Sequence, residues 1–227
     1  MRVFPLRASH KRARAATPEF APESRVASTE AAHYAQPVQP VQIIDASPRW
    51  AQEFQAVAQR LRAGLGELAL RIDHIGSISV PGLAAKDIID VQVAVAALDA
   101  HRLVPAFTQA GFQHHTDNPG DHRPPDARGP DQDWAKLFFS PRTGRAANIH
   151  VRVVGRPNQR YALLFRDYLR AHPQAAAAYA ELKRRLAALG IARSVYAEVK
   201  DPACDIIMVA ANAWANAVSW KPGPPDA

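Results

Sequence analysis

The chain has 227 residues, one cysteine and a formal net charge of +7. This length suits one domain plus a terminal extension, and a single cysteine excludes an internal disulfide. No apolar run is long enough to cross a bilayer and no secretory signal opens the chain, so we expect a cytoplasmic protein without membrane contact. The basic charge favours anionic partners such as nucleotides, coenzymes or nucleic acid, without choosing among them.

Residues 1–40 combine basic side chains with Ala, Ser and Pro, and contain few large apolar residues. Such a segment buries too little surface to offset the entropy of ordering, so we expect a disordered basic tail. An arm that touches nucleic acid is the alternative. After an edge strand at 41–44, Ser47 and Pro48 predict the start of a helix. Its buried stripe follows at spacings of three and four: Trp50, Phe54, Val57, Leu61 and Leu65.

The central stretch, residues 70–95, is predicted to form a strand, a Gly76-Ser77 turn, a short connector and a second strand. A period of two puts Asp90 and Gln92 on one face of the second strand. A glycine-serine turn lets backbone N–H groups approach an anion, and a neighbouring carboxylate can bind Mg²⁺. The residues alone leave two interpretations open, a site for a nucleotide with its metal or a plain β core with a tight turn.

The middle of the chain is predicted to contain a helix, a strand, a polar loop and two more strands, at 98–110, 112–115, 116–133, 134–140 and 147–154. The loop holds several His and Asp residues, but their spacing matches no zinc pattern, so we expect a mobile flap. Asn148, His150 and Arg152 share one face of the last strand. There His150 can bind metal, contact phosphate or serve as an ordinary sheet histidine.

The C-terminal half is predicted to be helical, with helices at 158–171, 174–189, 192–200 and 202–220 and a frayed end at 221–227. Lys183, Arg184 and Arg185 form a basic cluster on the helix at 174–189. Tyr196 and Lys200 fall on one face of a helix, where they can reach a phosphate or simply pack together at the surface. Cys204 precedes an apolar run, which favours a packing role.

Four stretches of the chain resemble the GrpB family, also called UPF0157, and the resemblance extends from about residue 41 to about residue 220. These stretches are residues 45–50, 73–93, 148–153 and 165–170. The resemblance implies an α/β (α+β) fold like the palm of polymerase β, in the nucleotidyltransferase-like superfamily, with a mixed sheet and a helical C-terminal half. In some actinobacterial proteins of this family the domain is fused behind dephospho-CoA kinase.

A nucleotidyltransferase palm usually holds two metal ions with an Asp-x-Asp pair and a third carboxylate. This chain reads Asp90-Val91-Gln92 at the pair and carries His150 at the third place. We therefore expect at most one Mg²⁺, carried in by a nucleotide and bound by Asp90. Our hypothesis makes Asp90 and His150 the catalytic candidates. The substrate-binding candidates are Gly76, Ser77, His74, Lys86, Gln92, Arg152, Tyr196 and Lys200.

The function implied is binding of a nucleotide or another phosphate-bearing small molecule, with or without transfer of a nucleotidyl group. The competing interpretation is an inactive module that binds a nucleotide or coenzyme, or stabilises a partner. Nucleic-acid binding is the third choice, because no array of base-stacking aromatic residues is visible. The incomplete carboxylate set leaves open whether the protein is an enzyme.

Overall fold

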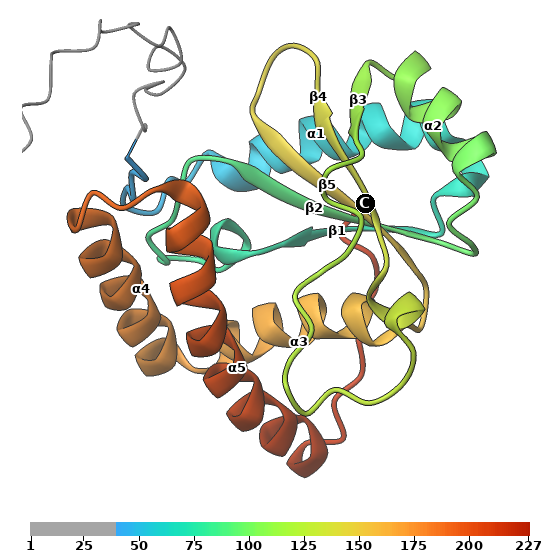
Figure 1. Ribbon diagram of the computed structural model, residues 1–227. Coiled ribbons are helices and arrows are strands. Elements are labelled where there is room, and N and C mark those ends of the chain that lie inside the picture. Colours follow the sequence, from blue (N-terminus) through green and yellow to red (C-terminus); the bar gives the residue numbers. More distant parts are fainter. Residues whose placement is uncertain (1–39) are drawn as a thin grey trace, which may run out of the picture. The chain divides into compact units, whose positions relative to one another are not determined.

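The computed structural model describes residues 40–227, so the expected basic tail lies outside the described residues apart from its last position. A five-stranded mixed sheet lies between layers of helices (Figure 1). Its strand order is β1 (Arg71–Ile75), β2 (Ile89–Val95), β5 (Ala147–Val153), β4 (Leu137–Pro141) and β3 (Phe112–His115). Strands β2 and β5 are parallel and the other pairs antiparallel, which confirms the predicted mixed sheet.

One face of the sheet is covered by α1 (Trp50–Leu65) and α2 (Ala100–Gln109). The apolar residues that alternate along the two central strands point to this side, since successive side chains of a strand face opposite ways. They pack with the stripe of α1 and the aromatic residues of α2 and β4 into one buried cluster. Its members include Phe54, Leu61, Ile89, Val91, Val93, Phe107, Phe139, Ile149 and Val151.

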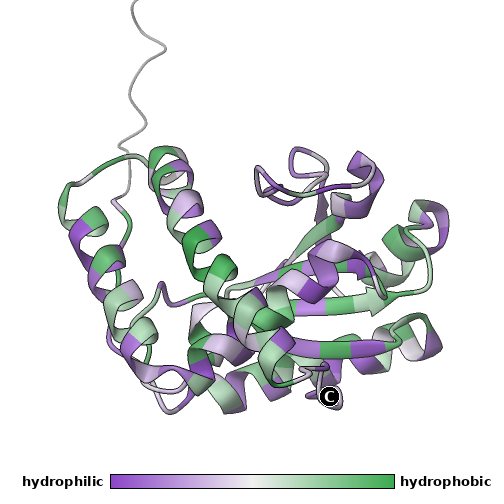
Figure 2. Cartoon of the chain, turned by 90° about the horizontal axis from the view of Figure 1, so that it is seen from below, coloured by the Kyte–Doolittle hydropathy of each residue, from purple (hydrophilic) through white to green (hydrophobic). Residues whose placement is uncertain are grey.

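The other face of the sheet is polar along its centre and looks toward α3 (Pro157–Ala171), α4 (Pro173–Ala188) and α5 (Arg193–Ala217). The three helices pack on one another around a second buried cluster, which includes Leu164, Phe165, Leu169, Tyr179, Met208 and Ala211. Hydrophobic and hydrophilic residues are mixed along each of these helices, as expected for amphipathic segments (Figure 2). Short 3₁₀ turns occupy Gly66–Leu68, Ser77–Ser79 and Asp131–Trp134. The helical C-terminal half is therefore confirmed.

Several element boundaries differ from the sequence prediction, among them the strand expected at 134–140, which begins at Leu137. Helix α1 begins at Trp50, because Ser47 Oγ accepts a hydrogen bond from Arg49 N (3.3 Å) in a preceding turn. The expected edge strand at 41–44 is reduced to a single bridge between Ile44 and Ala85. Helix α5 runs unbroken through Pro202, which lies on its exposed side. Packing of α5 against α3 and α4 sustains the helix where the proline removes a hydrogen bond.

The C-terminal segment 221–227 is not frayed, contrary to the prediction. Asp226 Oδ2 accepts hydrogen bonds from the backbone N–H of His74 (2.9 Å) and from Arg166 Nη1 (2.7 Å). The backbone N–H groups of Asp226 and Ala227 both donate to Ile72 O at 3.1 Å. Strand β1 is an edge strand whose outer backbone groups need partners, and this segment supplies them.

Candidate functional site

A cavity of about 330 Å³ opens between the polar face of the sheet and helices α3 to α5. Its lining comes from parts of the chain that are far apart in sequence: the end of β1, the connector before β2, the polar faces of β2 and β5, the loop 116–133, and the three helices. The cavity therefore has a sheet wall and a helical wall. Most of the candidate residues from the sequence line one or the other.

The glycine-serine corner and Asp90 adjoin on the sheet wall. Strand β1 pairs with β2 so that Ile75 lies opposite Asp90, and the corner follows directly. Gly76 has φ +70° and ψ −173°, and a Cβ at this position would lie 2.9 Å from Asp90 Cβ and collide with Asp90 Oδ2. A side chain at Gly76 would thus occupy the space of the carboxylate. Ser77 follows on the cavity side.

Asp90 keeps one carboxylate oxygen toward the corner, while the other accepts a hydrogen bond from Asn148 Nδ2 (2.8 Å) on β5. Burial raises the pKa of Asp90, whereas the Asn148 hydrogen bond and the charges of Lys86 and Lys200 oppose that rise. Asp90 therefore lies in a desolvated setting, surrounded by hydrogen-bond donors and cations.

The side chains around Asp90 do not fit a resident metal ion. Gln92 is fully buried and does not line the cavity; its Oε1 accepts from Arg152 Nη1 (2.7 Å) and its Nε2 donates to Gln159 O (3.3 Å). Asp73 is paired with Arg71, and Asp87 with Arg145. Within residues 40–227, no group of three or more His, Cys, Asp or Glu side chains is placed to hold a metal. We therefore derive no chemical step through a bound metal.

Arg152 lines the cavity, but its charge is matched by a residue that the sequence did not single out. Its Nε and Nη2 donate to the two oxygens of Asp121 (2.7 and 2.8 Å), and Lys136 Nζ donates to Asp121 Oδ1 (3.0 Å). Burial opposes ionisation, yet Arg152 and Lys136 hold the pKa of Asp121 well below its usual range. Asp121 belongs to the loop 116–133, which is therefore anchored here instead of forming a free flap.

His150 lies beside this cluster with its ring 5.2 Å from that of Phe138. Its Nδ1 is buried and has no hydrogen-bond partner among residues 40–227; an Asp121 carboxylate oxygen lies 3.9 Å away. Burial, together with the charges of Arg152 and Lys136, lowers the pKa of His150 well below its ordinary value. His150 is thus a neutral imidazole that can exchange hydrogen bonds with a ligand but adds no positive charge.

Lysines and tyrosines form the helical wall. Lys86 Nζ lies 5.3 Å from the centre of the Tyr196 ring, and Lys200 Nζ donates to Asp201 Oδ1 (3.2 Å) and Cys204 Sγ (3.5 Å). Cys204 is buried against Tyr179, as the packing interpretation required. Lys183 also reaches the cavity from α4, donates to the carbonyl oxygen of Ala84 and is 3% exposed.

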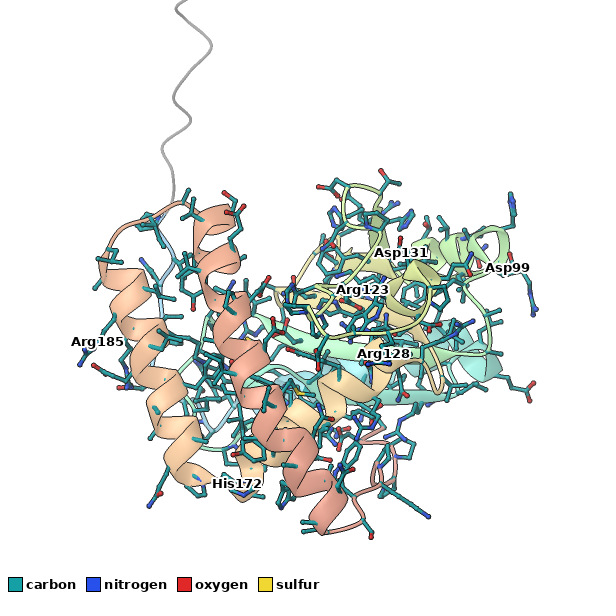
Figure 3. All side chains as sticks on the ribbon, turned by 60° about the horizontal axis from the view of Figure 1, so that its bottom comes forward. Asp99, Arg123, Arg128, Asp131, His172 and Arg185 are labelled. Carbon is teal, nitrogen blue, oxygen red and sulfur yellow. The ribbon has the colours of Figure 1, made fainter. Side chains whose placement is uncertain are left out.

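The sequence marks Lys183 only as a member of a basic cluster, and the structure turns it inward. Lys183 lies four residues after Tyr179 and three before Leu186, both of which are buried. The helical spacing along α4 therefore already indicated that Lys183 points inward. Arg185, two positions later, points into solvent (Figure 3). No comparable periodicity marks Asp121, because its partners come from other elements.

The structure brings most of the candidate residues together, namely Gly76, Ser77, Lys86, Asp90, His150, Arg152, Tyr196 and Lys200. It separates Gln92, which is buried behind Arg152, and His74, which points to the opposite face. The His74 ring stacks on Phe54 of α1 (centroids 4.5 Å apart), and burial lowers its pKa to about 4. Alternation along β1 explains this, since Ile75 and not His74 shares the face of Asp90.

Comparisons with known proteins agree on one family. A family model described as GrpB protein matches residues 40–209. A dephospho-CoA kinase from Mycolicibacterium paratuberculosis is 36% identical over 198 residues, which is 81% of this chain but 49% of the relative. The chain thus spans about half the length of the kinase relatives it matches. UPF0157 protein BH1888 from Halalkalibacterium halodurans is 35% identical, with 76% of this chain and 83% of the relative covered.

Among solved structures, the crystal structure of a GrpB protein from Enterococcus faecalis matches with a TM-score of 0.62 and 28% identity. The match covers 76% of this chain and 99% of that one. The arrangement of sheet and helices described above is therefore shared with that solved protein. Within residues 40–227, no helix has the length and apolar character needed to cross a membrane.

Proposed function

This chain belongs to the GrpB family, and from that membership we propose that its cavity binds a nucleotide or a nucleotide-containing coenzyme through the phosphate groups. The observation that carries the proposal is that the Gly76-Ser77 corner, Lys86 and Lys200 line one cavity. Backbone N–H groups at such a corner and ammonium groups are donors that phosphate oxygens accept from. The volume is at the lower end of the range for small-molecule sites, about 300–1,000 Å³.

Nucleotidyl transfer is the second candidate function, because Asp90 and His150 stand where the family resemblance puts catalytic groups. The site's charges favour binding without transfer. Gln92 carries no charge, and its side-chain oxygen accepts a hydrogen bond from Arg152. His150 is also neutral. The magnesium ion expected from the sequence stays a prediction, and it depends on Asp90 as its protein ligand.

The names of the relatives suggest which ligands to try first. Several proteins named dephospho-CoA kinase contain a region similar to this chain in about half of their length. We therefore propose ATP and dephospho-CoA as the first candidates. A module that stabilises such a kinase, without a ligand of its own, is the alternative.

Thermal unfolding in the presence of each candidate tests the proposal. A ligand that binds the folded protein at about 100 times its Kd adds about 2.7 kcal/mol to the unfolding free energy and raises the midpoint. We expect such a rise with ATP or dephospho-CoA, and expect it to shrink in Lys200→Met. Asp45→Ala, an exposed carboxylate outside the cavity, is the control and keeps the rise.

The absence of any shift at millimolar concentrations of both ligands, with and without MgCl₂, would contradict the proposal and favour the partner-stabilising alternative. Pyrophosphate release from ATP, measured in the same samples, separates transfer from binding. Release above the level seen with Asp90→Asn would favour the transferase.

A further inference from the structure

Three lysines from separate parts of the chain reach the same cavity: Lys86 before β2, Lys183 on α4 and Lys200 on α5. They are close enough to influence one another, because the charges of Lys200 and Lys86 add to the effect of burial in lowering the pKa of Lys183, which falls to about 7. Like charges gathered in a partly desolvated site destabilise the empty protein. An anion entering the cavity relieves that cost.

The immediate contacts of Lys183 are neutral. Its ammonium group donates to the carbonyl oxygen of Ala84 and lies 4.7 Å from the centre of the Tyr179 ring. Burial of an ammonium group is expensive unless a counter-charge is present. Asp90 is the carboxylate that acts on Lys183 from across the cavity. The cavity can therefore accommodate a bound anion next to the Lys183 ammonium group, in addition to the Asp90 side chain.

An unpaired donor on the helical wall points to a ligand independently of the charges. Tyr196 is fully buried, lines the cavity and has no hydrogen-bond partner for its hydroxyl group in the part of the chain that the structure describes. Tyr161 on α3 also lines the cavity. Buried polar atoms are normally paired, so such atoms beside a cavity indicate groups that a ligand satisfies. Phenol hydroxyls can donate to phosphate oxygens.

The sheet wall offers Asp90, while Asp121 is already paired with Arg152 and Lys136. Among residues 40–227, no group of three or more His, Cys, Asp or Glu side chains could hold a divalent ion. From this asymmetry we infer that Lys183, Lys200 and Lys86 form a polyphosphate subsite that neutralises the phosphate chain of the ligand without a divalent cation. The inference rests on the proposed function and deepens it by naming how the phosphates are held.

Calorimetric titration with inorganic tripolyphosphate in EDTA tests the subsite. We expect binding without any metal, no tightening when Mg²⁺ replaces EDTA, and a loss of roughly tenfold or more in Lys183→Met, since a hydrogen bond to a charged group is worth that much. Arg185→Met removes a cation two residues away on the exposed side of α4 and is the matched control, with affinity unchanged. Lys200→Met gives a second subsite variant if Lys183→Met fails to fold.

The outcomes separate this inference from the proposed function. Tripolyphosphate binding that requires Mg²⁺ and disappears in Asp90→Ala overturns the lysine subsite but leaves nucleotide binding in place. Equal weakening by Lys183→Met and Arg185→Met also overturns the subsite, because it indicates nonspecific attraction. ATP binding that weakens in Lys200→Met but not in Lys183→Met removes the three-lysine subsite and leaves the proposed function in place. Absence of binding by tripolyphosphate, ATP and dephospho-CoA removes both.

Discussion

Gly76 adopts φ +70° and ψ −173°, a backbone conformation that is essentially restricted to glycine. The conformation turns the chain sharply at the end of β1 and brings the corner against Asp90 without an intervening side chain. The sequence predicted this neighbourhood because the strands on both sides alternate clearly. It did not predict that the glycine's missing Cβ is what leaves room for the carboxylate.

Gly76→Ala is expected to destabilise the protein by about 2–4 kcal/mol, the sum of backbone strain and displacement of Asp90. Urea denaturation measures the change. Gly82→Ala is the control, since Gly82 also has a positive φ of +77° but open space around a new Cβ. Gly82→Ala introduces the backbone strain without a steric contact. An equal loss of unfolding free energy in both variants would therefore show that contact with Asp90 is unimportant.

At the level of elements, the loop 116–133 is the clearest departure from expectation. Its polar, Pro-rich composition predicted mobility, and composition cannot reveal that one residue, Asp121, lies against Arg152, Lys136 and Asn158. The same holds for α5, where Pro202 predicted a break that tertiary packing overrides. Both errors come from contacts between segments distant in sequence, which local patterns do not encode.

Asp121→Asn is expected to cost about 3 kcal/mol or more in unfolding free energy, because Arg152 and Lys136 lose a buried counter-charge. Trypsin cleavage after Arg128, in the same loop, should accelerate correspondingly. Asp131→Asn is the control: Asp131 pairs with Arg123 on the surface, and its side chain is 96% exposed (Figure 3). Such surface pairs contribute little. Unchanged cleavage in Asp121→Asn would contradict the anchoring role.

The pH dependence follows from the lowered pKa of Asp121. The unfolded chain binds a proton at this carboxyl at a higher pH than the folded chain does, so stability is present above the unfolded pKa of about 4 and is lost as pH falls toward the folded value. Denaturation midpoints between pH 2 and pH 6 should therefore fall less steeply in Asp121→Asn than in the original protein. Parallel curves would exclude this linkage.

For the whole molecule, periodicity predicted the succession of strands and helices along the chain, and the family resemblance implied the mixed sheet. Together they supplied eight of the residues that line the cavity. The sequence did not predict His74 pointing away, Lys183 pointing inward, or the C-terminal segment closing the edge of β1. Asp226 has no local pattern that links it to Arg166, sixty residues earlier. Such pairings follow from the assembled fold.

Asp226→Ala tests the contribution of that segment. Arg166 is almost fully buried and would keep Asp167 and the carbonyl oxygen of His74 as partners, so we expect a loss of about 2 kcal/mol. The loss is measured by thermal melting of the variant. The control is Asp45→Ala, which removes an exposed ion pair with Arg184. Equal midpoints for the two variants would mean that the segment contributes nothing to stability.

The cavity draws its two walls from distant stretches of chain, with Gly76 and Asp90 on one side and Lys183 and Lys200 on the other. A molecule that contacts both walls would link the sheet layer to the helices. Thermal unfolding or proteolysis would then require release of this molecule before the two layers separate. The half-life of the folded protein during heating or proteolysis should therefore increase with the concentration of the ligand that occupies the cavity.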